Sequence, residues 1–238
     1  PLNISRETIQ SDRRIMKMNR LLVKKLIREL SKISRKESEK YDKFWEEFGN
    51  FIKEGIVTDQ RNSKKLLKLL RFQTSKTESG NMIGLEEYIK RMPEGQEEIY
   101  YLVGESMDML KLSPHLGYFE KEGYEVILLD KPIDNFLMMN IPSYSTKVKK
   151  DGEKEEVTFV FKPIDETEHE PEKEGEDGEE KEKDEEVSNE MENFLNGVKE
   201  ILGTKIIDAK TSERLYNNPC RLANPAGGMS SSQQRAMR

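Results

Sequence analysis

Residues 165–186 are too acidic to contribute to a hydrophobic core. They contain 14 Asp and Glu residues against 3 Lys, a net charge of −11. A segment with this composition has too little apolar surface to offset the entropy lost when a chain is ordered. We therefore expect a mobile insertion here, dispensable for folding, with folded structure before and after it.

The first third of the chain has the opposite charge. Residues 1–76 contain 20 Lys and Arg against 10 Asp and Glu, a net charge of +10. Apolar residues recur at spacings of three and four, which predicts a long amphipathic helix. These residues are Ile15, Met18, Leu22, Leu26, Leu30 and Ile33. A basic nucleic-acid-binding module is one interpretation. A solvated face is the better one, because the basic residues share polar helix faces without exposed aromatic residues between them.

Two more helices are expected before residue 71. Ser34 and Glu37 resemble a capping box, and Gly55 is typical of a helix end. Between them lies an apolar face that we expect to be core, made of Tyr41, Phe44, Trp45, Phe48, Phe51 and Ile52. A short Leu-rich helix over residues 66–70 completes a helical unit, which we place at residues 1–76.

The next segment alternates between helical and strand patterns. Helices are expected at residues 85–92, 107–122 (interrupted at Pro114) and 133–139, and buried strands at 98–103 and 124–129. This alternation favours a small α/β layer with parallel strands, at residues 77–146. The chain as a whole is therefore expected to be mixed α/β (α+β).

A third region is expected at residues 147–238, around the acidic insertion. It has strand patterns at residues 157–161, 205–210 and 220–223 and an amphipathic helix at 187–202. The single cysteine, Cys220, excludes an intrachain disulfide and is expected to be a small core residue. His115 and His169 have no metal-ligand spacing, glycine-rich phosphate loops are absent, and no apolar run could span a membrane.

Arg6 is the most informative candidate site residue. It lies in the first turn of the long helix, where the helix dipole already presents positive potential. A cation there suits a phosphate or carboxylate site, with Asn3 and Gln10 close enough to add neutral hydrogen bonds. From the residues alone, a solvated arginine near a helix start is the better interpretation.

Several short motifs in a fixed order are typical of one protein family. They are PLNISRE at residues 1–7, LLRF at 69–72, IYYLVGES at 99–106, PID at 132–134 and SERL with NPC at 212–220. On these residues the chain resembles the heat shock protein 90 family, from late in its middle domain into its C-terminal domain. The match covers nearly everything except the acidic run.

The resemblance implies a dimeric, ATP-driven chaperone that binds client proteins and co-chaperones. Arg6 would contact the ATP γ-phosphate, supported by Asn3 and Gln10, and Mg²⁺ would accompany the nucleotide. The segments that resemble the family do not include its nucleotide-binding domain. We therefore expect no ATPase activity from this segment alone. Met229 and Met237 would contact clients, in a sequence context closer to bacterial and organellar members. A non-enzymatic interaction scaffold is the alternative.

Residues 39–49 and 54–58 resemble the mitochondrial, tumour-necrosis-factor-receptor-associated branch of the family. This resemblance implies a mitochondrial or other organellar location for the full-length protein. A cytoplasmic location is the alternative.

Overall fold

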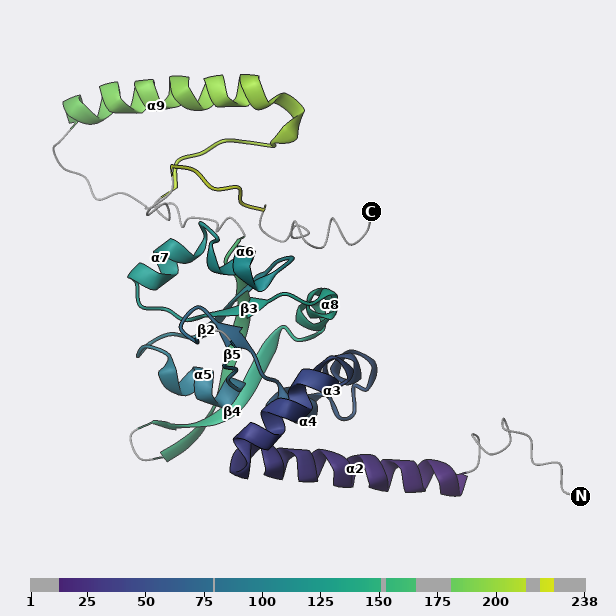
Figure 1. Cartoon of the computed structure of the whole chain (residues 1–238). Helices are drawn as coiled ribbons and strands as arrows, with labels where there is room; N and C mark the ends of the chain where they lie inside the picture. Colours follow the sequence, from purple (N-terminus) through teal and green to yellow (C-terminus); the bar gives the residue numbers. More distant parts are fainter. Residues whose placement is uncertain (1–12, 79, 151–152, 166–180, 213–218, 225–238) are drawn as a thin grey trace, which may run out of the picture.

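The structure is a computed structural model that describes residues 13–78, 80–150, 153–165, 181–212 and 219–224. Its described helical and strand segments form a mixed α/β fold, as the sequence predicts. Figure 1 shows two helices crossing at one end of a sheet and smaller helices along the sheet.

The helical unit contains two long helices and a short one. The first two are α2 (Arg13–Lys36) and α3 (Ser38–Thr58); α4 (Ser63–Leu66) and a 3-10 turn, η1 (Leu67–Leu69), follow. The predicted capping box is wrong, because α2 continues through Ser34 and Glu37 is the N-cap of α3. The Ser34 hydroxyl instead donates to the Ser31 carbonyl at 3.2 Å, within its own helix.

Five strands form one mixed sheet. They are β1 (Gln73–Thr74), β2 (Glu98–Val103), β3 (Val126–Leu129), β4 (Ser143–Lys150) and β5 (Glu153–Pro163), in the order β1-β3-β2-β5-β4. The predicted parallel pairing of β2 with β3 is confirmed, and β2 also pairs in parallel with β5. The outer pairs, β1 with β3 and β4 with β5, are antiparallel.

Helices cover both faces of this sheet. They are α5 (Leu85–Arg91), α6 (Met107–Lys111), α7 (Leu116–Lys121) and α8 (Pro132–Asn140). β3 is buried along its whole length, and its side chains alternate between two apolar clusters. Ile127 and Leu129 join the larger cluster, which includes the helical unit, whereas Val126 and Leu128 join the smaller one under α6 and α7.

The β4–β5 hairpin extends this sheet past residue 146. Tyr144 and Phe159 lie opposite each other in the hairpin and are both buried in the larger cluster. The first residues of the expected third region therefore complete the sheet of the α/β layer. The division of the chain into domains at residues 76 and 146 stays a prediction.

After the sheet, the structure describes α9 (Lys181–Leu202) and a 3-10 turn, η2 (Gly203–Lys205). The predicted helix at 187–202 is confirmed, and it begins inside the acidic run; the rest of that run from residue 166 lies outside the described residues. The predicted strands at 205–210 and 220–223 are wrong, because these residues have no strand pairing in the structure. Cys220 is exposed and not a core residue.

Candidate functional site

All five residues predicted to form sites lie outside the described residues. Asn3, Arg6 and Gln10 precede α2, and Met229 and Met237 follow residue 224. The structure shows instead the elements to which these segments are attached. The candidate site is therefore described through α2, which follows Arg6 in the chain, and through the helices packed beside it.

Helix α2 packs into the apolar core of the body only from Val23 onward. Residues 13–22 are exposed, whereas Ile27 and Leu30 are buried and Val23 and Ile33 are partly buried against α3 and the turn η1. Ten exposed residues extend for about 15 Å along a helix. Figure 1 shows this part of α2 projecting from the body toward the N-terminus.

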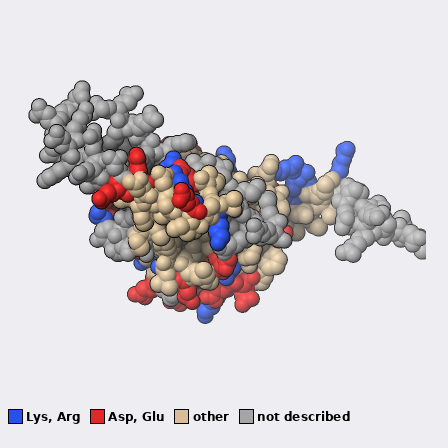
Figure 2. All heavy atoms as spheres, turned by 90° about the horizontal axis from the view of Figure 1, so that it is seen from above, with Lys and Arg blue, Asp and Glu red and all other residues tan. Residues whose placement is uncertain are grey.

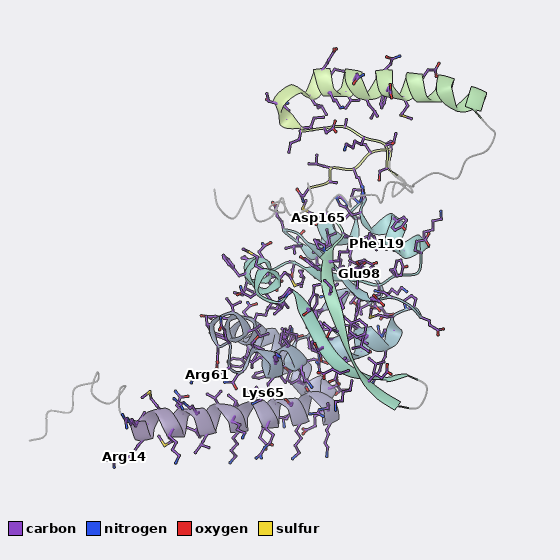
Figure 3. All side chains as sticks on the ribbon, turned by 180° about the vertical axis from the view of Figure 1, so that it is seen from behind. Arg14, Arg61, Lys65, Glu98, Phe119 and Asp165 are labelled. Carbon is purple, nitrogen blue, oxygen red and sulfur yellow. The ribbon has the colours of Figure 1, made fainter. Side chains whose placement is uncertain are left out.

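The exposed part of α2 is strongly basic and also carries apolar side chains. Figure 2 shows Lys and Arg gathered where this helix projects. In Figure 3, Arg14 lies on the projecting part, Arg61 and Lys65 lie near the turn after α3, and Asp165 lies at the opposite end of the body. Beside α2, an open cleft is lined by Asn19, Arg20, Val23 and residues 58–62.

Arg71 fastens the C-terminal end of α2. Its guanidinium donates to the Ser34 carbonyl at 3.0 Å and to its own neighbour, the Leu70 carbonyl, at 3.2 Å. The same group lies 4.6 Å from the centre of the Tyr41 ring and forms a long ion pair, 3.8 Å, with Asp42. Tyr41 is fully buried and donates to the Leu69 carbonyl at 2.6 Å. Burial raises the pKa of Tyr41 to about 12, so this hydroxyl stays a donor at physiological pH.

A buried ion pair joins α3 to α8. Lys53 Nζ lies 2.5 Å from Asp134 Oδ1, and the two side chains are only 8% and 1% exposed. The second Asp134 oxygen accepts from the Lys131 backbone N–H at 3.1 Å, which caps α8. Burial raises the pKa of Asp134, and the nearby Lys53 ammonium opposes that shift. Because each charge of a buried pair would be strongly unfavourable alone, the pair favours a fixed packing of the two helices.

The same two helices expose large apolar side chains to solvent. On α3, Phe48 and Phe51 are 51% and 66% exposed; on α8, Phe136 and Met139 are 54% and 63% exposed. The prediction that Phe48 and Phe51 belong to the core is wrong. The buried stripe of α3 contains Tyr41, Trp45, Gly49, Lys53 and Ile56, and the two phenylalanines lie outside it. They contact each other, and Phe48 stacks on Phe44.

The described residues contain no group of three His, Cys, Asp or Glu side chains that could hold a metal ion. His115 is largely buried, and burial together with the nearby Arg221 lowers its pKa to about 4. It is therefore neutral at physiological pH. Among the described helices, none has an apolar stretch able to cross a bilayer.

The whole chain, residues 1–238, matches the family model described as Hsp90 protein. It is 37% identical over its full length to proteins named "Chaperone protein HtpG" from Geobacter sulfurreducens and Geobacter metallireducens. It is 35% identical over 231 residues, 97% of the chain, to the HtpG chaperone of Serratia proteamaculans. The chain spans 35% of the length of each of these relatives. Together with the mixed α/β fold and the ordered motifs, this match shows that the chain belongs to the Hsp90 family.

Proposed function

We propose that the chain is a segment of an ATP-dependent molecular chaperone and that its α3–α8 surface binds client proteins. The observation that carries this proposal is the exposure of Phe48, Phe51, Phe136 and Met139 on two packed helices of a chaperone-family chain. The helices themselves are fixed by the buried Lys53–Asp134 pair. A rigid support with exposed apolar side chains suits the binding of unfolded polypeptides.

The chemistry of these side chains suits clients of varied sequence. Exposed apolar groups gain free energy when they leave water, whatever apolar partner covers them. Methionine adapts its shape to irregular partners, and aromatic rings add a large contact area. Met229 and Met237 are proposed as further client contacts.

The ATP-dependent step is assigned to the segment before α2. Arg6 would contact the γ-phosphate, with Asn3 and Gln10 supporting it, and the Mg²⁺–ATP complex would be bound mainly by other parts of the full-length protein. An arginine in this place would stabilise charge on the transferring phosphoryl group. The strong positive charge of the adjacent helix, where α2 carries ten Lys and Arg and one Glu, supports an anionic ligand near this end.

The assembly and location of the full-length protein are proposals of the same kind. Homodimerisation and co-chaperone binding follow from the family alone. The mitochondrial branch rests on the resemblance of residues 39–49 and 54–58, while the relatives named above are bacterial. A non-enzymatic scaffold is the second candidate, and it differs by predicting client binding that is independent of ATP.

The client surface is tested in the full-length protein with an unfolded model polypeptide. Phe136→Ser with Met139→Ser should weaken binding about tenfold, the loss expected from removing a little over 1 kcal/mol of apolar contact. The matched control is Met109→Ser with Leu112→Ser on α6, where the residues are at least as exposed, at 61% and 84%. This control should change binding less than about twofold.

Salt separates client binding from electrostatic binding. Apolar contacts should persist when salt is raised, whereas binding to phosphates weakens steeply. Equal losses in both double variants, or loss of binding in moderate salt, would refute the α3–α8 surface as the client site.

A further inference from the structure

We propose that Arg71 is a positioning residue for the ATP-dependent step, which it serves by fixing the direction of α2. This inference rests on the proposed role of Arg6. It assigns no contact between Arg71 and the nucleotide. Arg71 acts at the opposite end of the helix from Arg6, by holding the end that is attached to the body.

The geometry of α2 makes its attachment decisive. The side chains of residues 13–22 are exposed and join no apolar cluster, so the packing of α2 into the core of the described body begins at Val23. Ser34 lies about 32 Å along the helix from Arg13 at 1.5 Å per residue. A tilt of about 5° at Ser34 would therefore move the start of α2 by about 3 Å. The placement of any group just before α2 depends on how firmly its C-terminal half is held.

The contacts of Arg71 hold the C-terminal half of α2 against the body. The Ser34 carbonyl that it binds belongs to the last turn of α2, where carbonyls lack partners within the helix and carry partial negative charge. The guanidinium reaches this carbonyl while it stacks on Tyr41 of α3 and binds the Leu70 carbonyl. Its side chain is only 10% exposed. One planar group thus links α2, α3 and the chain after η1.

The surrounding backbone leaves room for this arginine. A Cβ atom on Gly84 would lie 2.8 Å from Arg71 Nη1, closer than real contacts allow. Because Gly84 has no side chain, the Arg71 guanidinium has room beside it. A lysine at position 71 would keep the charge near Asp42 but could not make two directed hydrogen bonds while stacking on Tyr41.

The expected signature is a loss of turnover without a loss of affinity. Misplacing a catalytic group by about 1 Å can cost up to about 100-fold in rate. Nucleotide binding should be spared, because most of it is assigned to other parts of the full-length protein. A purely structural role for Arg71 would lower stability and leave kcat per folded molecule unchanged.

The test uses the full-length protein in a cysteine-free background with spin labels at Lys17→Cys and Glu46→Cys. These positions are exposed on α2 and α3, so the distance between the labels reports the direction of α2. Arg71→Met should broaden the distance distribution and lower kcat at least about tenfold, with the KM for ATP within about twofold. Arg71→Lys should fall between Arg71→Met and the parent protein in both measurements. Thermal unfolding shows which variants are folded. If Arg71→Met does not fold, Arg71→Lys alone still tests the proposal.

Arg35→Met is the matched control. Arg35 also donates to a carbonyl of the α2 C-terminal region, Ser31 O at 3.0 Å, but it is exposed and contacts only its own helix in this bond. Neither distance nor kcat should change in this variant. Unchanged distances in Arg71→Met would overturn the positioning role. A broadened distribution with unchanged kcat would instead show that Arg71 directs α2 and that the proposed role of Arg6 fails.

Discussion

The body of the molecule has a core that buries charged as well as apolar side chains, whereas the first ten residues of α2 bury neither. The body buries even charged side chains, as in the Lys53–Asp134 pair, and gives them partners. On the projecting part of α2, large apolar side chains such as Met18, Leu21 and Leu22 are 56–60% exposed. The difference indicates where the stability of the described structure resides. The body specifies its own packing, whereas the placement of the projecting helix depends on its attachment.

The largest predicted effect is at the buried ion pair. Lys53→Met should lower the free energy of unfolding by about 4 kcal/mol, because Asp134 is left buried without its counter-charge. Adding Asp134→Asn, which removes the charge and keeps an oxygen for the α8 cap, should recover at least half of the loss. Urea unfolding of the three proteins measures both values.

The matched control for this prediction is Lys199→Met. Lys199 also pairs with an aspartate, Asp208, at 2.6 Å, but both side chains are 42% exposed. Its loss should leave the free energy of unfolding nearly unchanged, because exposed ion pairs contribute little to stability. If Lys53→Met and Lys199→Met lowered the free energy of unfolding by similar amounts, the buried pair in the body would be no more important for stability than an exposed pair outside it.

Apolar truncation gives the next largest effect. Leu69→Ala removes a fully buried side chain and should cost about 3 kcal/mol, whereas Leu22→Ala, at a position 59% exposed, should cost less than about 0.5 kcal/mol. The midpoints of urea unfolding at equal slope give the comparison. A cost for Leu22→Ala near that of Leu69→Ala would mean that the projecting helix is packed in solution.

The smallest predicted effect is a pH dependence that arises in the body. His115 has its pKa lowered to about 4 by burial and then by Arg221, so between pH 6.5 and 4 the unfolded chain binds more protons than the folded one. Stability should therefore fall as the pH drops through this window. With its partial exposure taken into account, the loss from pH 7 to pH 5 should be about 1 kcal/mol.

A His115→Gln variant isolates this contribution. The difference in unfolding free energy between the parent protein and the variant should shrink in the direction of lower pH, because only the parent carries the buried imidazole. Parallel pH profiles for the two proteins would show that the imidazole ring titrates normally.

Strong periodic patterns predicted much of the fold, and weak or context-dependent ones did not. The repeat of apolar residues in α2 and the four buried residues of β3 were sufficient to predict those elements. β4 was missed because its apolar residues are few among Ser, Thr and Lys, and its pairing with β5 supplies the strand geometry. The strand patterns at 205–210 and 220–223 were wrong, since short apolar runs form strands only where a neighbouring strand is available.

The candidate site was less accessible from the sequence. The role of Arg6 stays a prediction from helix position and resemblance. The exposure of Phe48, Phe51 and Phe136 depends on how far the larger cluster extends around α3 and α8, which no local pattern predicts. In the sequence, Arg71 stands out only as part of the LLRF motif at residues 69–72. Its contacts with Ser34 and Tyr41 join residues 30 or more positions away in the chain, and no local pattern predicts them.

The most direct test of the proposed function is ATP turnover and nucleotide affinity measured on full-length protein carrying Arg6→Ala. A γ-phosphate contact by Arg6 predicts a loss in kcat equivalent to about 2–4 kcal/mol of transition-state stabilisation, with nearly unchanged nucleotide affinity and unchanged folding. Arg6→Lys should restore only part of the rate, because an ammonium group lacks the guanidinium fork. Arg35→Ala, in the last turn of α2 at the end far from Arg6, is the control and should leave turnover unchanged. Unchanged turnover in Arg6→Ala would contradict the assignment of a catalytic arginine to this segment.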